Sequence, residues 1–268
     1  MTILRHRTQL VTALQAILCP ENEGNWEAVG QLVQPRLVVN GTPQHRDLFI
    51  TNLQRSTVFS SKLDICVADV NSQAVAARIL KTEQLPDNTG DEHQEIIFAW
   101  FTNGLLAALK TLEDVGQPNQ VSPTANTSHL EELIPTSLDL EARYRDYIKS
   151  INDKTMKDNF SKFCMPVVTH NAVQKTIPEY MALIEESQDA IEGLFFDIQD
   201  LIVDSEAGRV AARLQFTGVP IKTWADAEPN GDSVVFHEHV IYGLEGGKIH
   251  RVWSVVDVEA YRKQLRRG

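Results

Sequence analysis

The chain has 268 residues, 43% of them hydrophobic, and its 36 acidic against 25 basic side chains give a formal charge of −11. This length allows either one large domain or two domains of ordinary size. The acidic balance argues against nucleic acids and anionic membranes as partners, because both bind to clustered Lys and Arg side chains.

Residues 4–18 predict an opening helix rather than a secretory leader. Their apolar positions are interrupted by Thr8, Gln9, Thr12 and Gln15, whereas a leader has an unbroken apolar centre. No apolar run is long enough to cross a bilayer. The 3 cysteines are odd in number and widely spaced, which favours reduced thiols over a disulfide framework or a zinc site. We therefore expect a cytoplasmic protein without a membrane segment.

The chain contains an internal repeat. Three segments recur in the same order, namely 63–65 with 196–198, 75–78 with 210–213, and 104–115 with 247–258. The middle pair is the identical tetrapeptide Val-Ala-Ala-Arg, and the offsets of 133, 135 and 143 residues differ only where loops are expected. Such ordered self-similarity indicates two diverged copies of one unit.

A linker is predicted between the two copies. Pro118, Pro123 and Pro135 fall in a stretch that lacks a regular hydrophobic period, a composition typical of linkers. We predict a first domain at 1–117, a linker at 118–136 and a second domain at 137–268.

Each copy opens with helical periodicity and ends in strands. In the first copy we predict helices at 4–18, 25–33 and 46–54, with a β-branched run at 37–39. In the second copy we predict helices at 140–151, 157–164 and 178–190, a β-branched run at 166–169, and strands at 195–203, 209–217, 233–244 and 248–256. This order predicts an α+β unit in which a curved antiparallel sheet packs on helices and encloses a cavity. Because each unit has only a modest core, we expect the copies to pair through their sheets.

The second copy carries a family resemblance. Thr217-Gly218 stands at the end of a predicted strand, Gly247-Lys248-Ile249 forms a predicted turn, and Trp253, Asp257 and Gln264-Leu265 follow. This pattern resembles the SnoaL-like polyketide cyclases of the nuclear-transport-factor-2-like (NTF2-like) superfamily, and the first copy resembles them more faintly. The pattern departs from the family after Gly218, where members often place a His and this chain has Val219-Pro220.

The resemblance implies two tandem NTF2-like cones that form a covalently joined pseudo-dimer. It also implies a cofactor-independent cyclase of the lyase or isomerase type that acts in biosynthesis on a polyketide-like small molecule, including pyrone formation in secondary metabolism. The resemblance does not determine whether the chain also assembles into homo-oligomers. The same cone hosts isomerases, dehydratases, epoxide hydrolases and proteins that bind without reacting. A small-molecule-binding or interaction module is therefore the alternative.

Asp257 is the first candidate catalytic residue. Strand alternation places it on one face with Trp253. A carboxylate beside an aromatic ring has a raised pKa, which suits removal of a proton from a carbon between two carbonyl groups. The enolate then attacks a second carbonyl to close an aldol, lactone or pyrone ring. The alternative is that Asp257 only caps a helix beginning at Val258.

His237 and His239 are the other candidate catalytic residues. They share one face of a predicted strand, from which a His can hold an enolate or relay a proton. Two His without a third ligand at a telling spacing make a weak zinc site, so we expect no metal. A solvent-facing or core pair is the alternative.

A second set of residues is predicted to bind substrate. Trp224 lies in the long connection between two strands and would close the cavity as a lid, whereas Tyr147 would donate a hydrogen bond from the first helix of the second copy. An amphipathic core face is the other explanation for Tyr147. The set consists of His170, Arg213, Trp253, Trp224 and Tyr147.

Arg213 has two possible roles. A cation inside the cavity would stabilise an enolate oxygen, whereas a structural ion pair with Asp197 or Asp200 would leave it no catalytic part. An epoxide hydrolase would need Asp257, Arg213 and one of these aspartates to converge.

The first copy keeps fewer of these groups, so we expect it mainly to support the second. At the positions of Asp257, Trp253, His237 and His170 it has Asp114, Lys110, Gln94 and, nearby, Asn40.

Overall fold

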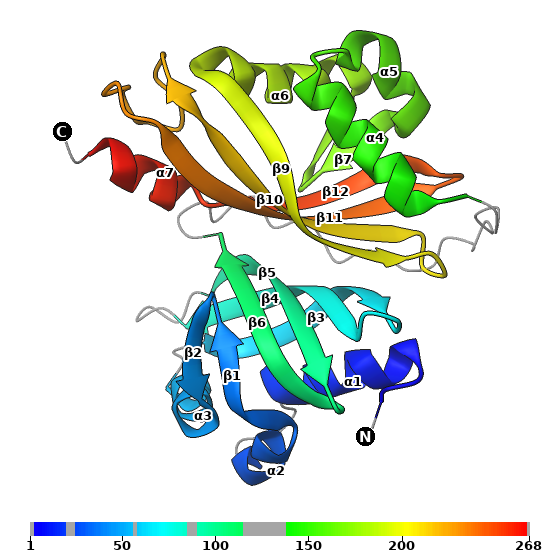
Figure 1. Cartoon of the computed structure of the whole chain (residues 1–268), viewed down its shortest axis with the longest axis vertical. Coiled ribbons are helices and arrows are strands. Elements are labelled where there is room, and N and C mark those ends of the chain that lie inside the picture. The colour runs from blue at the N-terminus through cyan, green and yellow to red at the C-terminus, as the bar shows by residue number, and fades with distance from the viewer. Residues whose placement is uncertain (1–2, 20–24, 56–57, 85–89, 115–137, 267–268) are drawn as a thin grey trace. The chain divides into compact units, whose positions relative to one another are not determined.

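The computed structural model describes residues 3–19, 25–55, 58–84, 90–114 and 138–266 (Figure 1). The chain divides into two compact units, residues 1–125 and 126–268, hereafter the first half and the second half. The linker predicted at 118–136 lies outside the described residues.

The first half contains three helices and six strands in its described part. They are α1 (Arg7–Leu18), α2 (Trp26–Gln31), β1 (Val33–Val39), β2 (Thr42–His45), α3 (Arg46–Gln54), β3 (Val58–Asp69), β4 (Ala74–Gln84), β5 (Gly90–Thr102) and β6 (Leu105–Glu113). The short strand β2 was not predicted, because its sequence lacks the β-branched pattern of the longer strands.

The second half repeats this order and adds a C-terminal helix. Its elements are α4 (Leu140–Asn152), α5 (Met156–Phe163), β7 (Cys164–His170), β8 (Val173–Thr176), α6 (Ile177–Ala190), β9 (Ile191–Asp204), β10 (Arg209–Pro220), β11 (Val234–Glu245), β12 (Lys248–Val256) and α7 (Val258–Leu265). Across the described residues, the helices are too short or too polar to traverse a lipid bilayer.

The two sheets have the same strand order, β2-β1-β6-β5-β4-β3 and β8-β7-β12-β11-β10-β9. This agreement confirms the tandem repeat and the α+β class. The sheets differ from the predicted antiparallel ones at one pair each, because β1 runs parallel to β6 and β7 runs parallel to β12. A short hairpin turn forces its two strands to be antiparallel, but neither of these pairs is joined by a hairpin.

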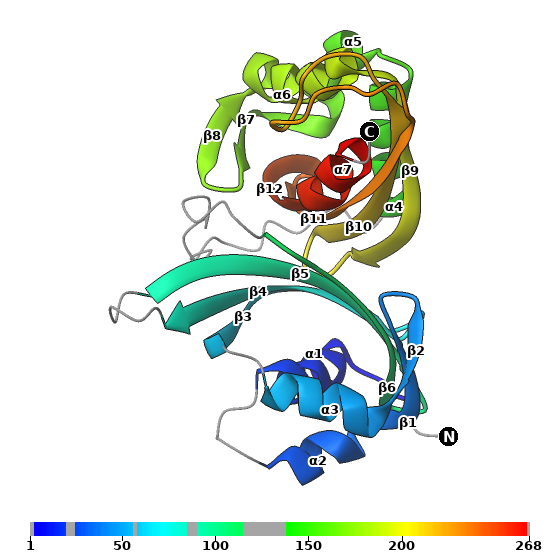
Figure 2. The same ribbon diagram turned by 90° about the vertical axis from the view of Figure 1, so that its left-hand side faces the viewer.

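Helices cover one side of each curved sheet, and this side is hereafter the interior of that half. In the first half the sheet curves around α1 and α3 (Figure 2). In the second half α4, α5 and α6 lie across the sheet (Figure 1). Because side chains alternate between faces along a strand, every second residue points into the interior. On β10 these residues are Val210, Ala212, Leu214 and Phe216.

An asparagine with a left-handed backbone fixes the same turn in both halves. Asn40 and Asn171 have φ values of 48° and 49°, a conformation that Asn adopts more readily than most residues. The Asn171 amide donates to the Ser254 carbonyl over 3.2 Å and accepts from the Ser254 N–H over 2.9 Å. In the first half, the Asn40 Oδ1 accepts from the Thr111 N–H over 2.8 Å. Each asparagine therefore ties the turn after the first strand to the last strand.

Two substitutions at Asn171 separate its hydrogen bonds from its backbone conformation. Asn171→Gly keeps the left-handed turn but removes both bonds, so we expect the free energy of unfolding of the second half to fall by about 2 kcal/mol. Asn171→Ala should lose about 1 kcal/mol more, because a Cβ atom disfavours this conformation. Urea denaturation followed by circular dichroism measures both losses. Equal losses would contradict a contribution from the backbone conformation.

Candidate active site

Glu238 places a carboxyl group in the interior of the second half. It lies on β11 in the interior row that also contains Phe236 and Val240, and the Ser254 hydroxyl of β12 donates a hydrogen bond to its Oε1. Burial raises the pKa of Glu238 to about 7, although the Ser254 hydrogen bond opposes the shift. Near neutral pH both forms of the carboxyl are therefore populated, as an acid/base catalyst requires.

Four tyrosines surround the interior beyond Glu238 and are hereafter the tyrosine cluster. The Tyr242 ring centroid lies 5.1 Å from that of Tyr144 and 5.9 Å from that of Tyr147. The hydroxyl oxygens of Tyr147 and Tyr180 are 2.9 Å apart. Burial raises the pKa of each of the four phenols above its ordinary value. They consequently remain protonated at neutral pH and act as hydrogen-bond donors.

The hydroxyl of Tyr144 makes no well-aligned hydrogen bond to any residue that the structure describes. Its side chain is buried, with 4% of its surface exposed, and its charged and polar neighbours are Tyr242, Glu238 and Tyr180. Tyr242 is close enough to oppose the rise of the Tyr144 pKa, but none of the described residues meets Tyr144 Oη with good hydrogen-bond geometry. A buried polar group without a partner is costly, so this hydroxyl is available to an oxygen atom of a ligand.

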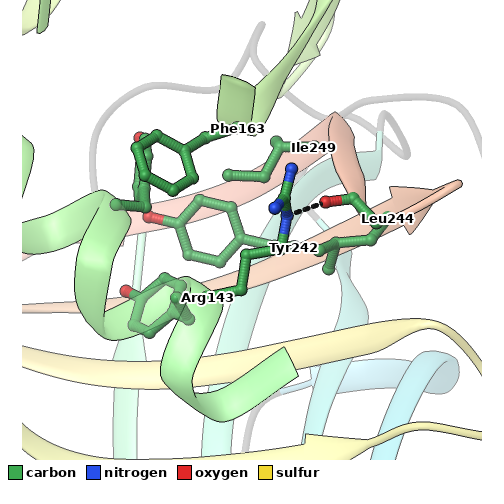
Figure 3. A pocket seen from close by; sticks show the side chains of 8 residues that line it. Arg143, Phe163, Tyr242, Leu244 and Ile249 are labelled. Carbon is green, nitrogen blue, oxygen red and sulfur yellow. Dashed lines mark hydrogen bonds between the residues drawn. The ribbon is translucent and has the colours of Figure 1, made fainter. Parts of the chain in front are cut away.

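A small cavity opens between α4 and the hairpin of β11 and β12 (Figure 3). Its volume is about 10 Å³, which is roughly the space of one water molecule. Arg143 spans one side, where its guanidinium donates to the Gly247 and Lys162 carbonyls and lies 5.6 Å from the Phe163 ring centroid. A larger ligand must therefore displace side chains. The lining residues are Arg143, Tyr144, Tyr147, Phe163, Tyr242, Leu244, Gly247 and Ile249.

His170 and Tyr147 are the predicted residues that lie at the end of the interior that contains the tyrosine cluster. The His170 ring is 5.9 Å from the ring of Tyr180, and Tyr147 lines the cavity. Burial, together with the charge of Lys175, lowers the pKa of His170 to about 4. The imidazole is therefore neutral at physiological pH.

Trp224 lies at the other end of the interior. Its ring centroid is 5.0 Å from that of Tyr261 on α7 and 5.8 Å from that of Phe236. The Tyr261 hydroxyl, like that of Tyr144, is buried and meets no hydrogen-bond partner in the described part of the chain. Glu238 thus lies on β11 between two aromatic groups, each of which contains an unsatisfied hydroxyl.

Asp257 is the N-cap of α7. Its Oδ1 accepts from the Ala260 N–H over 3.0 Å, and its own N–H donates to the His237 carbonyl over 2.8 Å. Asp257 therefore caps the helix, as the alternative interpretation of the sequence predicted, and one of its carboxylate oxygens stabilises the first turn of α7. Its catalytic role stays a prediction.

The remaining predicted residues point away from the interior. His237 and His239 alternate with the interior residues of β11, and Arg213 alternates with those of β10. Trp253 lies on the same outer face of β12 as Arg251, whose guanidinium is 5.1 Å from the Trp253 ring centroid. They do not line the cavity described here.

Arg213 forms the structural ion pair considered above. Its Nη1 lies 3.8 Å from Asp200 Oδ2, and burial lowers the pKa of the guanidinium while Asp200 opposes the shift.

Within the part of the chain that the structure describes, no three His, Cys, Asp or Glu side chains are arranged to hold a metal ion.

The sequence gives one indication of Glu238, which is its position between two histidines. His237-Glu238-His239 alternates on a strand, so either the histidines or the glutamate faces the interior. Phe236 and Val240 are apolar, as expected of an interior row, but Val235 and Ile241 on the opposite face are apolar too. The hydrophobic pattern alone therefore does not identify the interior face.

Comparisons with known proteins assign the second half to a family. The sequence model of the SnoaL-like polyketide cyclases matches residues 141–265. A SnoaL-like polyketide cyclase from Agrobacterium tumefaciens is 34% identical over 48% of this chain and 98% of its own, with a TM-score of 0.45. TsrD from Streptomyces laurentii is 21% identical over 48% of this chain and 97% of its own, with a TM-score of 0.43. No curated protein matches the chain.

Glu238 should make the stability of the second half fall as the pH rises. Well below the ordinary pKa of 4.5 the carboxyl is protonated in the folded and the unfolded chain. Between that pKa and the folded pKa of about 7, only the unfolded chain releases the proton. The free energy of unfolding should therefore decline by about 3 kcal/mol over this range. We expect Glu238→Gln to abolish the decline.

The difference between the wild type and Glu238→Gln isolates this effect. His170 acts in the opposite direction, because its lowered pKa makes stability fall as the pH drops from 6.5 towards 4. Both proteins contain His170, so its contribution cancels. Urea denaturation across this pH range measures the difference, and two parallel stability curves would contradict a raised pKa for Glu238.

Proposed function

The chain belongs to the SnoaL-like polyketide cyclase family, and from this premise we propose that its second half closes a ring on a polyketide-type carbonyl substrate. Glu238 is the proposed acid/base group. The observation that carries the proposal is a carboxyl group with a pKa of about 7 between two groups of aromatic side chains. Aromatic walls suit a largely apolar, planar substrate.

The reaction requires proton transfers and no change of oxidation state. The Glu238 carboxylate takes a proton from the carbon between two carbonyl groups, and the C–H electron pair becomes part of an enolate. The enolate attacks a second carbonyl through carbon, which gives an aldol ring, or it attacks an ester carbonyl through oxygen, which expels the alkoxide of the ester and gives a lactone or pyrone. The protonated Glu238 then returns its proton to the oxygen on which negative charge has developed.

Tyr144 is proposed to bind the enolate oxygen. Its hydroxyl is buried, lacks a partner and has Glu238 among its neighbours. A neutral phenol donates a stronger hydrogen bond to an enolate than to a ketone, because negative charge develops on that oxygen. The Tyr147–Tyr180 hydrogen bond positions the neighbouring rings of the tyrosine cluster.

Asp257 is the competing acid/base candidate, and binding without reaction is the competing function. The cap of α7 leaves the second carboxylate oxygen of Asp257 for other contacts, and the family resemblance points to this residue. The cavity of about 10 Å³ favours a binder of very small molecules over an enzyme, unless the side chains around it move apart.

Hydrogen exchange at a carbon next to a carbonyl tests the proposal without knowledge of the natural substrate. We expect the protein to accelerate deuterium incorporation into benzylacetone in D2O, followed by proton NMR. Glu238→Gln should lower the protein-dependent rate about a hundredfold, since a positioned base contributes at least this much. The exposed Glu259 of α7 provides the matched control, and Glu259→Gln should retain the rate.

Each other outcome contradicts part of the proposal. If Asp257→Asn abolishes exchange and Glu238→Gln does not, Asp257 is the base. If the wild type leaves benzylacetone exchange at the rate of buffer, the proposed enolate chemistry fails and a binding role takes its place.

Tyr144→Phe separates substrate activation from folding. The substitution removes a hydroxyl that makes no well-aligned hydrogen bond to a described residue, so we expect the free energy of unfolding to stay equal or to rise slightly. The exchange rate should fall by about tenfold to a hundredfold, because one donor to the developing oxyanion is lost. A loss of stability with full activity would contradict this role for Tyr144.

A further inference from the structure

The interior of the first half holds four ionisable side chains in contact. Lys81 Nζ lies 3.1 Å from Glu95 Oε2 and 2.9 Å from Glu113 Oε1. His93 Nε2 lies 2.8 Å from the same Glu113 oxygen. Their side chains retain between 13% and 35% of their exposure. These four residues are hereafter the charged cluster.

Strand pairing places the charged cluster on the interior face. Glu95 pairs with Glu113, and Thr111 pairs with Ile97, which belongs to the interior core. Lys81 continues the interior row of Val75, Ala77 and Ile79 on β4. Cys19, at the end of α1, has Glu95 and Lys81 among its charged neighbours. The cluster therefore lies under the end of α1, inside the cone.

Glu95 is the structural equivalent of Glu238. Ile97 pairs with Ala77 and Thr111 as Val240 pairs with Ala212 and Ser254, so each glutamate lies two residues before an equivalent position. Glu95 forms a side-chain hydrogen bond with Thr111, and burial raises its pKa. The link from asparagine through a hydroxyl residue to glutamate thus recurs in the two halves.

The rest of the charged cluster has apolar equivalents. By the same register, Lys81, His93 and Glu113 stand where the second half has Phe216, Phe236 and Val256. The Phe216 and Phe236 rings pack 5.0 Å apart. This fold consequently accepts hydrophobic side chains at these positions. Since partly buried ion pairs are seldom more stabilising than well-packed hydrophobic side chains, stability does not account for the charges.

The chemistry of the cluster matches that of a base beside an oxyanion site. Burial by itself would lower the pKa of Lys81, but Glu95 and Glu113 outweigh it and raise that pKa. Lys81 is therefore a permanent ammonium group in contact with the Glu95 carboxylate. Such a cation stabilises an enolate oxygen, and the surrounding polar groups favour a ligand with hydroxyl groups over an aromatic one.

We propose that the first half carries a second, separate acid/base site that enolises a small, neutral, hydroxylated carbonyl compound. Glu95 takes the proton from the carbon next to the carbonyl, the C–H electron pair forms the enolate double bond, and Lys81 donates a hydrogen bond to the enolate oxygen. Return of a proton from Glu95 to carbon completes the exchange. The inference rests on the enolate chemistry proposed for the second half.

Deuterium exchange into hydroxyacetone, measured in the Glu238→Gln protein, tests this site. In that background the carboxylate of the second half is absent, and we expect protein-dependent exchange to persist. Adding Glu95→Gln should lower it at least tenfold, whereas adding Glu92→Gln, at an exposed position of the same strand, should leave it unchanged. Exchange at the rate of buffer in the Glu238→Gln protein, or equal rates with and without Glu95→Gln, overturns the proposal. The benzylacetone measurement with the wild type tests the proposed cyclase site separately, so failure of one site is distinguished from failure of the other.

A second variant tests whether the charges only hold the fold. The triple substitution Lys81→Phe, His93→Phe and Glu113→Val copies the second half into the first. We expect its urea midpoint to equal or exceed that of the wild type and its hydroxyacetone exchange to be lost. A lower midpoint would show that the charged cluster stabilises the first half and would overturn the proposed role.

Discussion

The alternation of side chains along a strand is the constraint on which the chemistry of each half depends. Helices cover only one side of each sheet, so a residue either enters the interior or is excluded from it according to its position in the alternation. Glu238 enters, and His237 and His239 on either side of it do not. A shift of one residue in the strand would exchange these groups and would replace a carboxylic acid by two imidazoles. The bulges in β9 and β12 matter for the same reason, because each resets the alternation.

The architecture could be predicted from the sequence, because it depends on features that survive divergence. The repeat, the helices before strands and most strand positions follow from hydrophobic period and turn residues, and the same strand order in both halves confirms the duplication. The interior face could not be predicted, since Val235 and Ile241 are as apolar as Phe236 and Val240. Of the residues predicted to form the site, Tyr147, His170 and Trp224 lie in the interior, the first two because a helix stripe and a strand end leave less freedom. The ion pair of Arg213 with Asp200 was among the sequence-based alternatives, whereas the parallel strand pair depends on contacts between distant segments, which local patterns do not encode.

The two halves share a frame and differ in what fills it. Asn40 and Asn171 adopt the same turn, and a threonine or serine on the last strand bonds to a glutamate on the strand beside it in each half. Around this frame the second half has aromatic side chains and the first half has Lys81, His93 and Glu113. The same backbone therefore supports an apolar and a charged interior. The scaffold tolerates this because the residues that fix its turns are distinct from those that line the cone.

The unpartnered Tyr144 hydroxyl has a consequence for ligand selection. Among the described residues this buried group meets no partner with good hydrogen-bond geometry, and a buried polar group in this situation costs about 1–3 kcal/mol. A ligand that brings an oxygen to the hydroxyl releases this stored cost on binding, and a hydrocarbon of the same outline does not. With the binding role proposed for Tyr144, we expect an oxygenated molecule to bind roughly 5-fold to 150-fold more tightly than its deoxygenated analogue. This discrimination would arise because the hydroxyl is unsatisfied in the free protein and becomes satisfied in the complex.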